Sequence, residues 1–310
     1  MIDKLEVRVP AGARFTPEFE SLRRGWDEEF KRSRHYLAIA DLRPFGFSSI
    51  LHMRARKSRD HKLELIDTGV MAYTDMQREI ERVFDVDAST TTVMRLDLAA
   101  NVQGVPVQAF VGNVRAKFKR SATDLGSYSR TGKVGIETLY LGTRPNFFRI
   151  YNKIAEFHYQ DARLKRRDSG RPLAPFEERY GYPPTGVVLT RVERQIAGGR
   201  VPKEIDTFGK LVALAEFDPF APLEVTIGSA TPPNPDDYAW ATYLQGRGLR
   251  QVVIDHGYQN ARRLANKFSP GNANRLFNKL EPFLPASDCG LTKQQILEIY
   301  QKSVSKQLAA

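Results

Sequence analysis

Cysteine is almost absent from this sequence: Cys289 is the single one among 310 residues, which excludes an internal disulfide. The five histidines, at positions 35, 52, 61, 158 and 256, are scattered, and no Cys/His spacing typical of a zinc site occurs. No apolar run approaches the roughly eighteen residues that a membrane span needs. The amino-terminal stretch lacks the apolar segment of a secretory signal. These absences predict a cytoplasmic protein without a membrane partner.

Two nucleotide-related motifs are also absent. The chain has no Gly-x-x-x-x-Gly-Lys-(Ser/Thr) loop, so it carries no P-loop for ATP. It has no aromatic run of the kind that marks one large class of RNA-binding modules, which argues against that class. An ATP-driven motor is therefore not expected.

Positive charge is in clear excess. The sequence holds 47 Lys and Arg residues against 36 Asp and Glu residues, which gives a net charge of +11 and a pI of about 9.7. Such an excess indicates a polyanionic partner, either nucleic acid or an acidic membrane surface. A hydrophobic content of 41% and a mean hydropathy of −0.43 are typical of a soluble globular protein.

The periodicity of the apolar residues predicts an α+β fold. A central, mostly antiparallel sheet with flanking helices is expected first, followed by a C-terminal helical region. The stretch 228–237, with the sequence GSATPPNPDD, predicts a boundary. We therefore expect a first domain over residues 1–230 and a helical domain over residues 236–310. The second domain either contacts DNA or packs on the first.

Several stretches concentrate the basic side chains. One basic run follows a predicted strand over residues 46–54 and comprises Arg54, Arg56, Lys57, Arg59 and Lys62. Two further sets are candidate contacts for nucleic acid: Arg115, Lys117, Lys119 and Arg120 around Phe118, and Arg163, Lys165, Arg166 and Arg167 near the end of a predicted helix. Alternating cations with an aromatic ring suit a single strand. A basic strand exposed to solvent would explain the first set equally well. Cations that offset the dipole at the C-terminal end of a helix would explain the second.

Residues 136–142 and 147–151 predict two short strands joined by a turn. Both segments are rich in Ile, Leu, Thr, Phe and Tyr, and the residues between them include Gly, Pro and Asn. Because side chains alternate along a strand, Phe148 and Ile150 are expected to face the core. We expect a β-hairpin here.

The opposite face of the second strand carries Arg149, Tyr151 and Lys153. A tyrosine hydroxyl between two cations suits attack on a phosphodiester, because the cations favour the phenolate and neutralise the phosphate. The alternative is structural: a tyrosine that covers a half-buried sheet beside two solvated cations. The hairpin alone does not decide between them.

A longer pattern surrounds this strand. The turn reads Leu141-Gly142-Thr143-Arg144, the strand reads Arg-Ile-Tyr-Asn-Lys over residues 149–153, and Glu156 follows. This pattern resembles the signature of plasmid and phage rolling-circle replication initiators of the replication-initiation-factor (Rep_trans) type. The segments MIDKLEVRV, MRLDLAAN and TRVERQI resemble other strands of that family in the same order. The likeness extends over residues 1–200.

The resemblance implies a nucleophile and a metal site. Tyr151 corresponds to the family's nucleophile, and Asp3, Asp97 and Glu193 correspond to its acidic positions. These carboxylates would hold Mg²⁺ or Mn²⁺, since hard cations prefer oxygen ligands. The His-hydrophobic-His triplet of other initiators and relaxases is absent, which fits the carboxylate-rich group. A salt bridge to a neighbouring arginine is the alternative for each carboxylate.

Three cations complete the expected site. Lys153 and Arg149 would neutralise the phosphate or lower the pKa of the phenol, and Arg144 would orient the phosphate through two hydrogen bonds. We expect Asn152, which points the other way, to be structural.

The activity that follows is initiation of DNA replication. Tyr151 would nick one strand at an origin, become joined to the 5′ phosphate, free a 3′ hydroxyl as primer, and later rejoin the displaced strand. The expected partners are double-stranded origin DNA, single-stranded DNA, a host polymerase and a host helicase, and members of the family often act as dimers. The alternative is a non-catalytic, sequence-specific DNA-binding protein on the same scaffold.

Overall fold

The structure is a computed structural model that describes residues 1–23, 35–55, 59–66, 68–110, 114–118, 123–126, 138–143, 145–167, 175–177, 188–225, 263 and 291–310. Its strands are β1 (Ile2–Val9), β2 (Arg14–Phe15), β3 (Tyr36–Asp41), β4 (Ser49–Ala55), β5 (His61–Leu65), β6 (Phe84–Asp85), β7 (Thr92–Gln103), β8 (Val114–Ala116), β9 (Thr123–Gly126), β10 (Thr138–Thr143), β11 (Asn146–Asn152), β12 (Leu189–Ala197) and β13 (Leu223–Val225). The α-helices are α1 (Pro17–Arg23), α2 (Tyr73–Val83), α3 (Val107–Phe110), α4 (Lys153–Arg167) and α9 (Lys293–Ala309). The α+β fold class is confirmed.

Short 3-10 helices connect several of these elements. They are η1 (Arg43–Phe45), η2 (Thr68–Val70), η3 (Ala88–Thr90), η4 (Gly198–Arg200), η5 (Lys203–Ile205) and η6 (Phe208–Ala215). No helix in the described part of the chain is both long and apolar enough to cross a bilayer.

The chain divides into two compact units, and β7 and β12 contribute residues to both. Unit 1 comprises residues 1–99, 194–219 and 300–310, and unit 2 comprises residues 100–193 and 220–299. The predicted boundary between residues 1–230 and 236–310 stays a prediction. Apart from residue 263, the stretch 226–290 lies outside the described residues.

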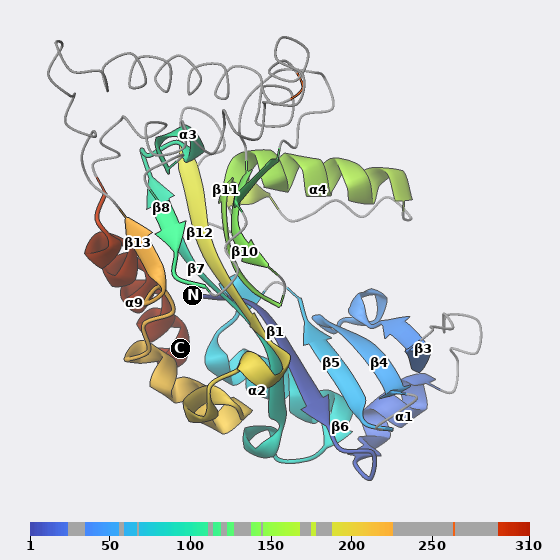
Figure 1. The fold of residues 1–310 in the computed structure, drawn as a ribbon. Coiled ribbons are helices and arrows are strands. Elements are labelled where there is room, and N and C mark those ends of the chain that lie inside the picture. The colour runs from blue at the N-terminus through green and yellow to red at the C-terminus, as the bar shows by residue number, and fades with distance from the viewer. Residues whose placement is uncertain are drawn as a thin grey trace, which may run out of the picture. The chain divides into compact units, whose positions relative to one another are not determined.

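Unit 1 is built on an antiparallel sheet in the order β3-β4-β5-β1-β7 (Figure 1). Its core lies on one face, where Leu5, Val7 and Leu63 are buried together with Phe19 of α1. The amphipathic helix α2 buries Met76, Ile80 and Val83, one stripe of its surface. The other face of the sheet is therefore left for the polar side chains of these strands.

The end of the chain belongs to unit 1 and holds its first strand. Gln307 of α9 accepts a hydrogen bond of 2.8 Å from the backbone N–H of Ile2. The same amide donates to the carbonyl oxygens of Thr68 and Met71. These bonds satisfy backbone groups at the edge of β1, and they fix the segment that contains Asp3.

The strands of unit 2 lie in the order β12-β11-β10-β9, with β10 antiparallel to both β11 and β9. Phe148 of β11 is fully buried, and its ring lies 5.6 Å from that of Phe118 and 6.3 Å from that of Phe220. A second apolar cluster joins Phe157 of α4, Phe176 and Leu189. These clusters position β11 and the start of α4.

Candidate active site

The predicted hairpin is confirmed, and its register places Tyr151. β10 and β11 pair antiparallel, with Tyr151 opposite Thr138 and Phe148 opposite Leu141. Phe148 and Ile150 are fully buried, as expected for the apolar face of the strand. Gly142 lies near the end of β10, opposite Phe147, with a φ of +95° that is readily adopted only by glycine.

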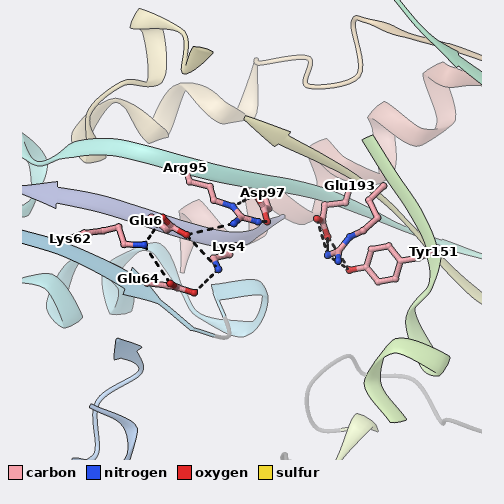
Figure 2. A network of polar contacts seen from close by, with 9 residues as sticks. Lys4, Glu6, Lys62, Glu64, Arg95, Asp97, Tyr151 and Glu193 are labelled. Atoms are coloured by element: carbon pink, nitrogen blue, oxygen red, sulfur yellow. Dashed lines mark hydrogen bonds and ion pairs between the residues drawn. The ribbon is translucent and has the colours of Figure 1, made fainter. Parts of the chain in front are cut away.

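Tyr151, Glu193 and Arg149 form a compact polar cluster within unit 2. Figure 2 shows the side chains of Tyr151 and Glu193 pointing toward one another. The phenolic O–H of Tyr151 donates to Oε2 of Glu193 at 2.9 Å. Nη2 of Arg149 lies 2.8 and 3.0 Å from the two oxygens of Glu193 and 3.4 Å from the phenolic oxygen. The Arg149 guanidinium also lies over the Tyr151 ring, 4.3 Å from its centre. The phenolic O–H of Tyr151 therefore lies beside both a proton acceptor, Glu193, and a cation, Arg149.

The burial of this cluster was not predicted. Tyr151 has no exposed surface and Glu193 is 1% exposed, whereas Arg149 is half-buried. Side chains alternate along β12, so Arg191 and Glu193 share a face. That face is also covered: both residues are buried, and Nε of Arg191 donates to Oδ1 of Asn101 at 2.8 Å. Burial strengthens each polar contact, because little water competes for it.

Lys153 lies at the first position of α4 rather than on the strand. Its ammonium is 3.0 Å from Oε2 of Glu156 and 5.7 Å from the centre of the Tyr151 ring. Asn152 is structural, as predicted, because its Oδ1 accepts from the backbone N–H groups of Ile154 and Ala155 and so caps the helix. The pairing of Lys153 with Glu156 follows from their spacing of three residues on a helix.

Asp97 lies in unit 1 and is held by an arginine of its own strand. Its Oδ1 accepts from Nε of Arg95 at 2.8 Å, and its Oδ2 accepts from Nη2 of the same side chain. Asp97 is 3% exposed, so this two-bond pair is largely shielded from water. The salt-bridge alternative considered for this carboxylate is what the structure contains.

Asp3 lies at an irregularity of β1. The pairing with β7 shifts between Ile2 and Lys4, so the strict alternation expected from the sequence is interrupted there. Ile2 is consequently buried with Leu5 rather than facing the polar side with Lys4. The carboxylate of Asp3 approaches Gly69, where an added Cβ would lie 3.3 Å from its Oδ1.

The polar face of the unit 1 sheet carries an ionic network that the sequence analysis missed (Figure 2). Glu6 lies 3.0 Å from Nζ of Lys62, 3.5 Å from Nζ of Lys4 and 3.7 Å from Nη1 of Arg95. Glu64 pairs with Lys4 and Lys62. Alternation of charged residues along β1 and β5 was the available signal, since residues of one face on adjacent strands become neighbours.

No metal-binding group is found among the described residues, meaning three or more His, Cys, Asp or Glu side chains arranged to hold an ion. Glu193 belongs to unit 2, whereas Asp3 and Asp97 belong to unit 1. The oxygens of Asp97 and Glu193 are engaged by arginines. The carboxylates are suitable donors for Mg²⁺ or Mn²⁺, but their convergence on an ion stays a prediction.

Few of the predicted DNA contacts fall on described side chains. Arg115 and Lys117 are exposed, and Lys117 pairs with Glu224 at 2.6 Å. Arg144, Lys119 and Arg120 lie outside the described residues. The backbone of α4 carries the remaining set, whose side chains are likewise not described: Arg163, Lys165, Arg166 and Arg167.

Comparison with known proteins gives little. No family model and no curated protein matches the chain. Among solved structures, one similar chain is a rolling circle replication initiator protein from Geobacillus stearothermophilus, the class of protein that the sequence motifs resemble. The identity is 16%, the match covers 79% of this chain and 94% of that chain, and the TM-score is 0.37. A likeness of that size does not assign an activity, which has to be argued from the residues.

Proposed function

We propose that this chain initiates rolling-circle replication by cleaving and rejoining one DNA strand through Tyr151. The hydrogen bond of 2.9 Å from the phenolic O–H to Glu193 is the observation that carries the proposal. A phenol is a weak nucleophile at neutral pH, and a carboxylate at hydrogen-bond distance can accept its proton. The sequence pattern around Tyr151, with its turn and its following Glu156, supports the same activity.

Each residue of the cluster has a distinct role in the proposed step. Glu193 accepts the phenolic proton as the oxygen of Tyr151 forms a bond to phosphorus. The bond from phosphorus to the 3′ oxygen breaks, and that oxygen takes up a proton and leaves as a 3′ hydroxyl. Arg149 lies beside both reacting oxygens of the protein, so its charge stabilises the phenolate that develops. One phosphodiester replaces another, so the step needs no ATP.

Lys153 has a supporting role in this scheme. Its ammonium lies on the Tyr151 ring and is paired with Glu156. Because Lys153 is 5% exposed, water screens its charge weakly, but the Glu156 carboxylate offsets much of that charge while the two are paired. Neutralisation of a bound phosphate would require this ammonium to exchange Glu156 for the phosphate.

The burial of Tyr151 sets a condition on the mechanism. A side chain without exposed surface cannot meet a DNA strand until the chain around it moves. We therefore propose that DNA binding opens the site, as in enzymes whose catalytic groups become accessible only when substrate binds. Without such a movement, the cluster of Tyr151, Glu193 and Arg149 would only stabilise the fold.

The metal ion belongs to the proposal as a requirement still to be measured. A bound Mg²⁺ or Mn²⁺ would polarise the scissile phosphate. Asp3, Asp97 and Glu193 are the candidate ligands, and no step above depends on them in that role. Removal of divalent ions with EDTA is expected to stop strand cleavage, and added Mg²⁺ or Mn²⁺ to restore it. Full activity after exhaustive EDTA treatment would remove the metal from the proposal.

A second function is favoured by one observation. The complete burial of Tyr151 and its satisfied hydrogen bond are what a purely structural tyrosine would have. The chain would then be a non-catalytic, sequence-specific DNA-binding protein. Its net charge of +11 is consistent with either function.

Formation of a covalent complex separates the two functions. The protein is incubated with Mg²⁺ and a pool of single-stranded oligonucleotides that carry a randomised centre and a 3′ label. A covalent 5′-phosphotyrosyl product keeps the 3′ part of the DNA, so labelled protein appears on a denaturing gel. We expect Tyr151→Phe to abolish this band and to leave DNA binding intact.

Tyr140 provides the matched control. It lies on the other strand of the same hairpin, opposite Arg149, and is half-buried. Tyr140→Phe is expected to keep the labelled band. A band that survives Tyr151→Phe would refute the assignment of the nucleophile, and DNA binding without any band would favour the non-catalytic function.

A further inference from the structure

The connection between β4 and β5 has two arginines in an unusual backbone conformation. Arg54 has a φ of 42° and Arg59 a φ of 60°, and these are the only positive φ values among the described residues other than glycine. Both side chains are exposed. The connection is closed by backbone bonds of 2.7 Å, from Ala55 N–H to the carbonyl of Asp60 and from Arg59 N–H to the carbonyl of Ala55.

The local backbone does not explain why arginine occupies these positions. A left-handed conformation is unfavourable for a residue with a long side chain, and glycine or asparagine adopts it more easily. Such strain persists where the side chain is needed for another purpose. The positive charge of Arg54 and Arg59 is the property that asparagine or glycine would lack.

Among the described residues, no carboxylate forms an ion pair with the guanidinium of Arg54 or Arg59. Asp60, the acid of the connection itself, lies 3.9 Å from Nε of Arg8, another exposed arginine at the end of β1. His61 is buried, and that burial together with the charge of Arg54 lowers its pKa to about 4, so it is neutral at pH 7.

The aromatic residues nearby are arranged for packing rather than for binding bases. The ring of His61 lies 5.3 Å from both Phe15 and Phe84. Phe84 is buried, and Phe15 is half-buried and covered by the guanidinium of Arg23 at 5.2 Å. A site for unpaired bases would offer exposed rings on which they stack. Tyr36, opposite Ala55, is half-buried, and its ring packs 5.0 Å from that of His52. With no exposed aromatic ring beside them among the described residues, the guanidinium groups favour a phosphate backbone.

We propose that Arg54, Arg59 and Arg8 form a binding site for the phosphate backbone of duplex DNA, separate from the Tyr151 cluster. Guanidinium groups bind phosphate oxygens through paired hydrogen bonds, and each contact releases counterions from the duplex. The site would hold the double-stranded flank while the strand to be cleaved is handled elsewhere. In that sense it extends the proposed function, although duplex binding by itself does not require Tyr151.

The test compares Arg54→Asn/Arg59→Asn with the unchanged chain. Binding to a fluorescent duplex is measured by anisotropy over a range of salt concentrations, and unfolding is measured by Tm. We expect affinity for duplex DNA to fall about ten-fold at about 100 mM salt and the salt slope to decrease by about two. The Tm is expected to be unchanged or higher, because asparagine relieves the left-handed strain.

Two matched variants distinguish charge from structure. Arg54→Lys/Arg59→Lys keeps the charge and is expected to retain most of the affinity and the salt slope. Arg78→Asn/Lys302→Asn removes the same charge from exposed positions elsewhere in unit 1 and is expected to leave both unchanged. Equal losses in the Arg78/Lys302 variant would mean that only net charge matters and would refute the site.

Three further outcomes would also overturn the proposal. A Tm that falls in Arg54→Asn/Arg59→Asn would give these arginines a structural role. Affinity lost only for single-stranded DNA, or only for anionic lipid vesicles, would assign the surface to a different partner. Cleavage is read separately with the labelled oligonucleotides: duplex binding that depends on the arginines without a covalent product would refute the nickase and leave the duplex site standing.

Discussion

The two units carry polar networks on their sheets that differ in one chemical respect. In unit 1, the described partners of Glu6 are ammonium and guanidinium groups, and Glu64 contacts Lys4, Lys62 and the imidazole of His52. In unit 2, Glu193 contacts an ion, Arg149, and also a neutral O–H group, that of Tyr151. Ion pairs between strands stabilise a sheet. A proton that can be transferred makes the second network a candidate for catalysis.

The largest expected effect tests whether the hydrogen bond between Tyr151 and Glu193 serves catalysis. Glu193→Gln still accepts a hydrogen bond from Tyr151 but is a poor proton acceptor. We expect covalent complex formation to slow by about 10² to 10⁴-fold, the usual contribution of a general base. The rate is measured with the labelled oligonucleotides and normalised to the folded fraction.

Glu6→Gln is the matched control for this variant, since Glu6 contacts three cations and, among the described residues, no hydroxyl. It is expected to leave the rate unchanged. An equal loss of rate in both variants would mean that both networks only stabilise the fold. A normal rate in Glu193→Gln would exclude Glu193 as the proton acceptor.

The ionic character of the unit 1 network predicts acid sensitivity. Burial would raise the pKa of Glu64, but hydrogen bonds from His52 and Lys4 and the charges of Lys4 and Lys62 together lower it from 4.5 to about 2. Because the pKa of Glu64 is lower in the folded protein than in the unfolded chain, the ionised carboxylate stabilises the fold above about pH 4.5. This stabilisation is lost as the pH falls from about 4.5 through 2. The contribution is at most about 3 kcal/mol. Urea unfolding between pH 6 and 2 should therefore show a steeper loss in the wild type than in Glu64→Gln.

The hairpin that carries Tyr151 offers a smaller, purely structural test. At Gly142 an added Cβ would lie 2.6 Å from the Phe118 ring and 3.2 Å from the carbonyl of Asn146, with φ at +95°. Gly142→Ala is expected to destabilise the protein by roughly 2 kcal/mol through strain and contact. Thermal unfolding measures this loss. A neutral result would mean that the turn relaxes easily and does not fix the position of Tyr151.

The smallest expected effect concerns a surface charge of unit 2. Lys117 and Glu224 form an exposed pair, so breaking it should change stability by less than about 1 kcal/mol. Glu224→Gln frees the ammonium of Lys117, and affinity for single-stranded DNA should rise about two-fold if Lys117 contacts a phosphate. Lys117→Ala should lower the affinity and cancel the effect of Glu224→Gln. An unchanged affinity in both variants would remove Lys117 from the DNA contacts.

Local patterns predicted most of the described elements. The Tyr151 hairpin follows from short-range rules. So does the start of α1, where Thr16 Oγ1 accepts a hydrogen bond from the N–H of Phe19 in the manner of an N-cap. The apolar residues over 203–215 favour an α-helix, but the structure has the 3-10 helices η5 and η6 there. Short 3-10 segments are common as connectors, and the residue pattern does not distinguish them from a short α-helix.

The site could be predicted only in part. Residue types and alternation predicted that Arg149 and Tyr151 share a face and that Glu193 points from β12. Neither could predict the burial of Tyr151, because burial depends on chain segments distant in sequence. The bulge at Asp3 and the Arg95–Asp97 pair likewise depend on strand register, since one shifted residue changes the face that a side chain occupies.

Identification of the covalently modified residue tests the central claim most directly. Trapped protein–DNA complex is digested with nuclease and protease, and the nucleotide-bearing peptide is sequenced by mass spectrometry. We expect a nucleotide joined through phosphate to the phenolic oxygen of Tyr151, with no such peptide from Tyr151→Phe. A nucleotide on any other residue, or no covalent product from active preparations that cleave DNA, would contradict it.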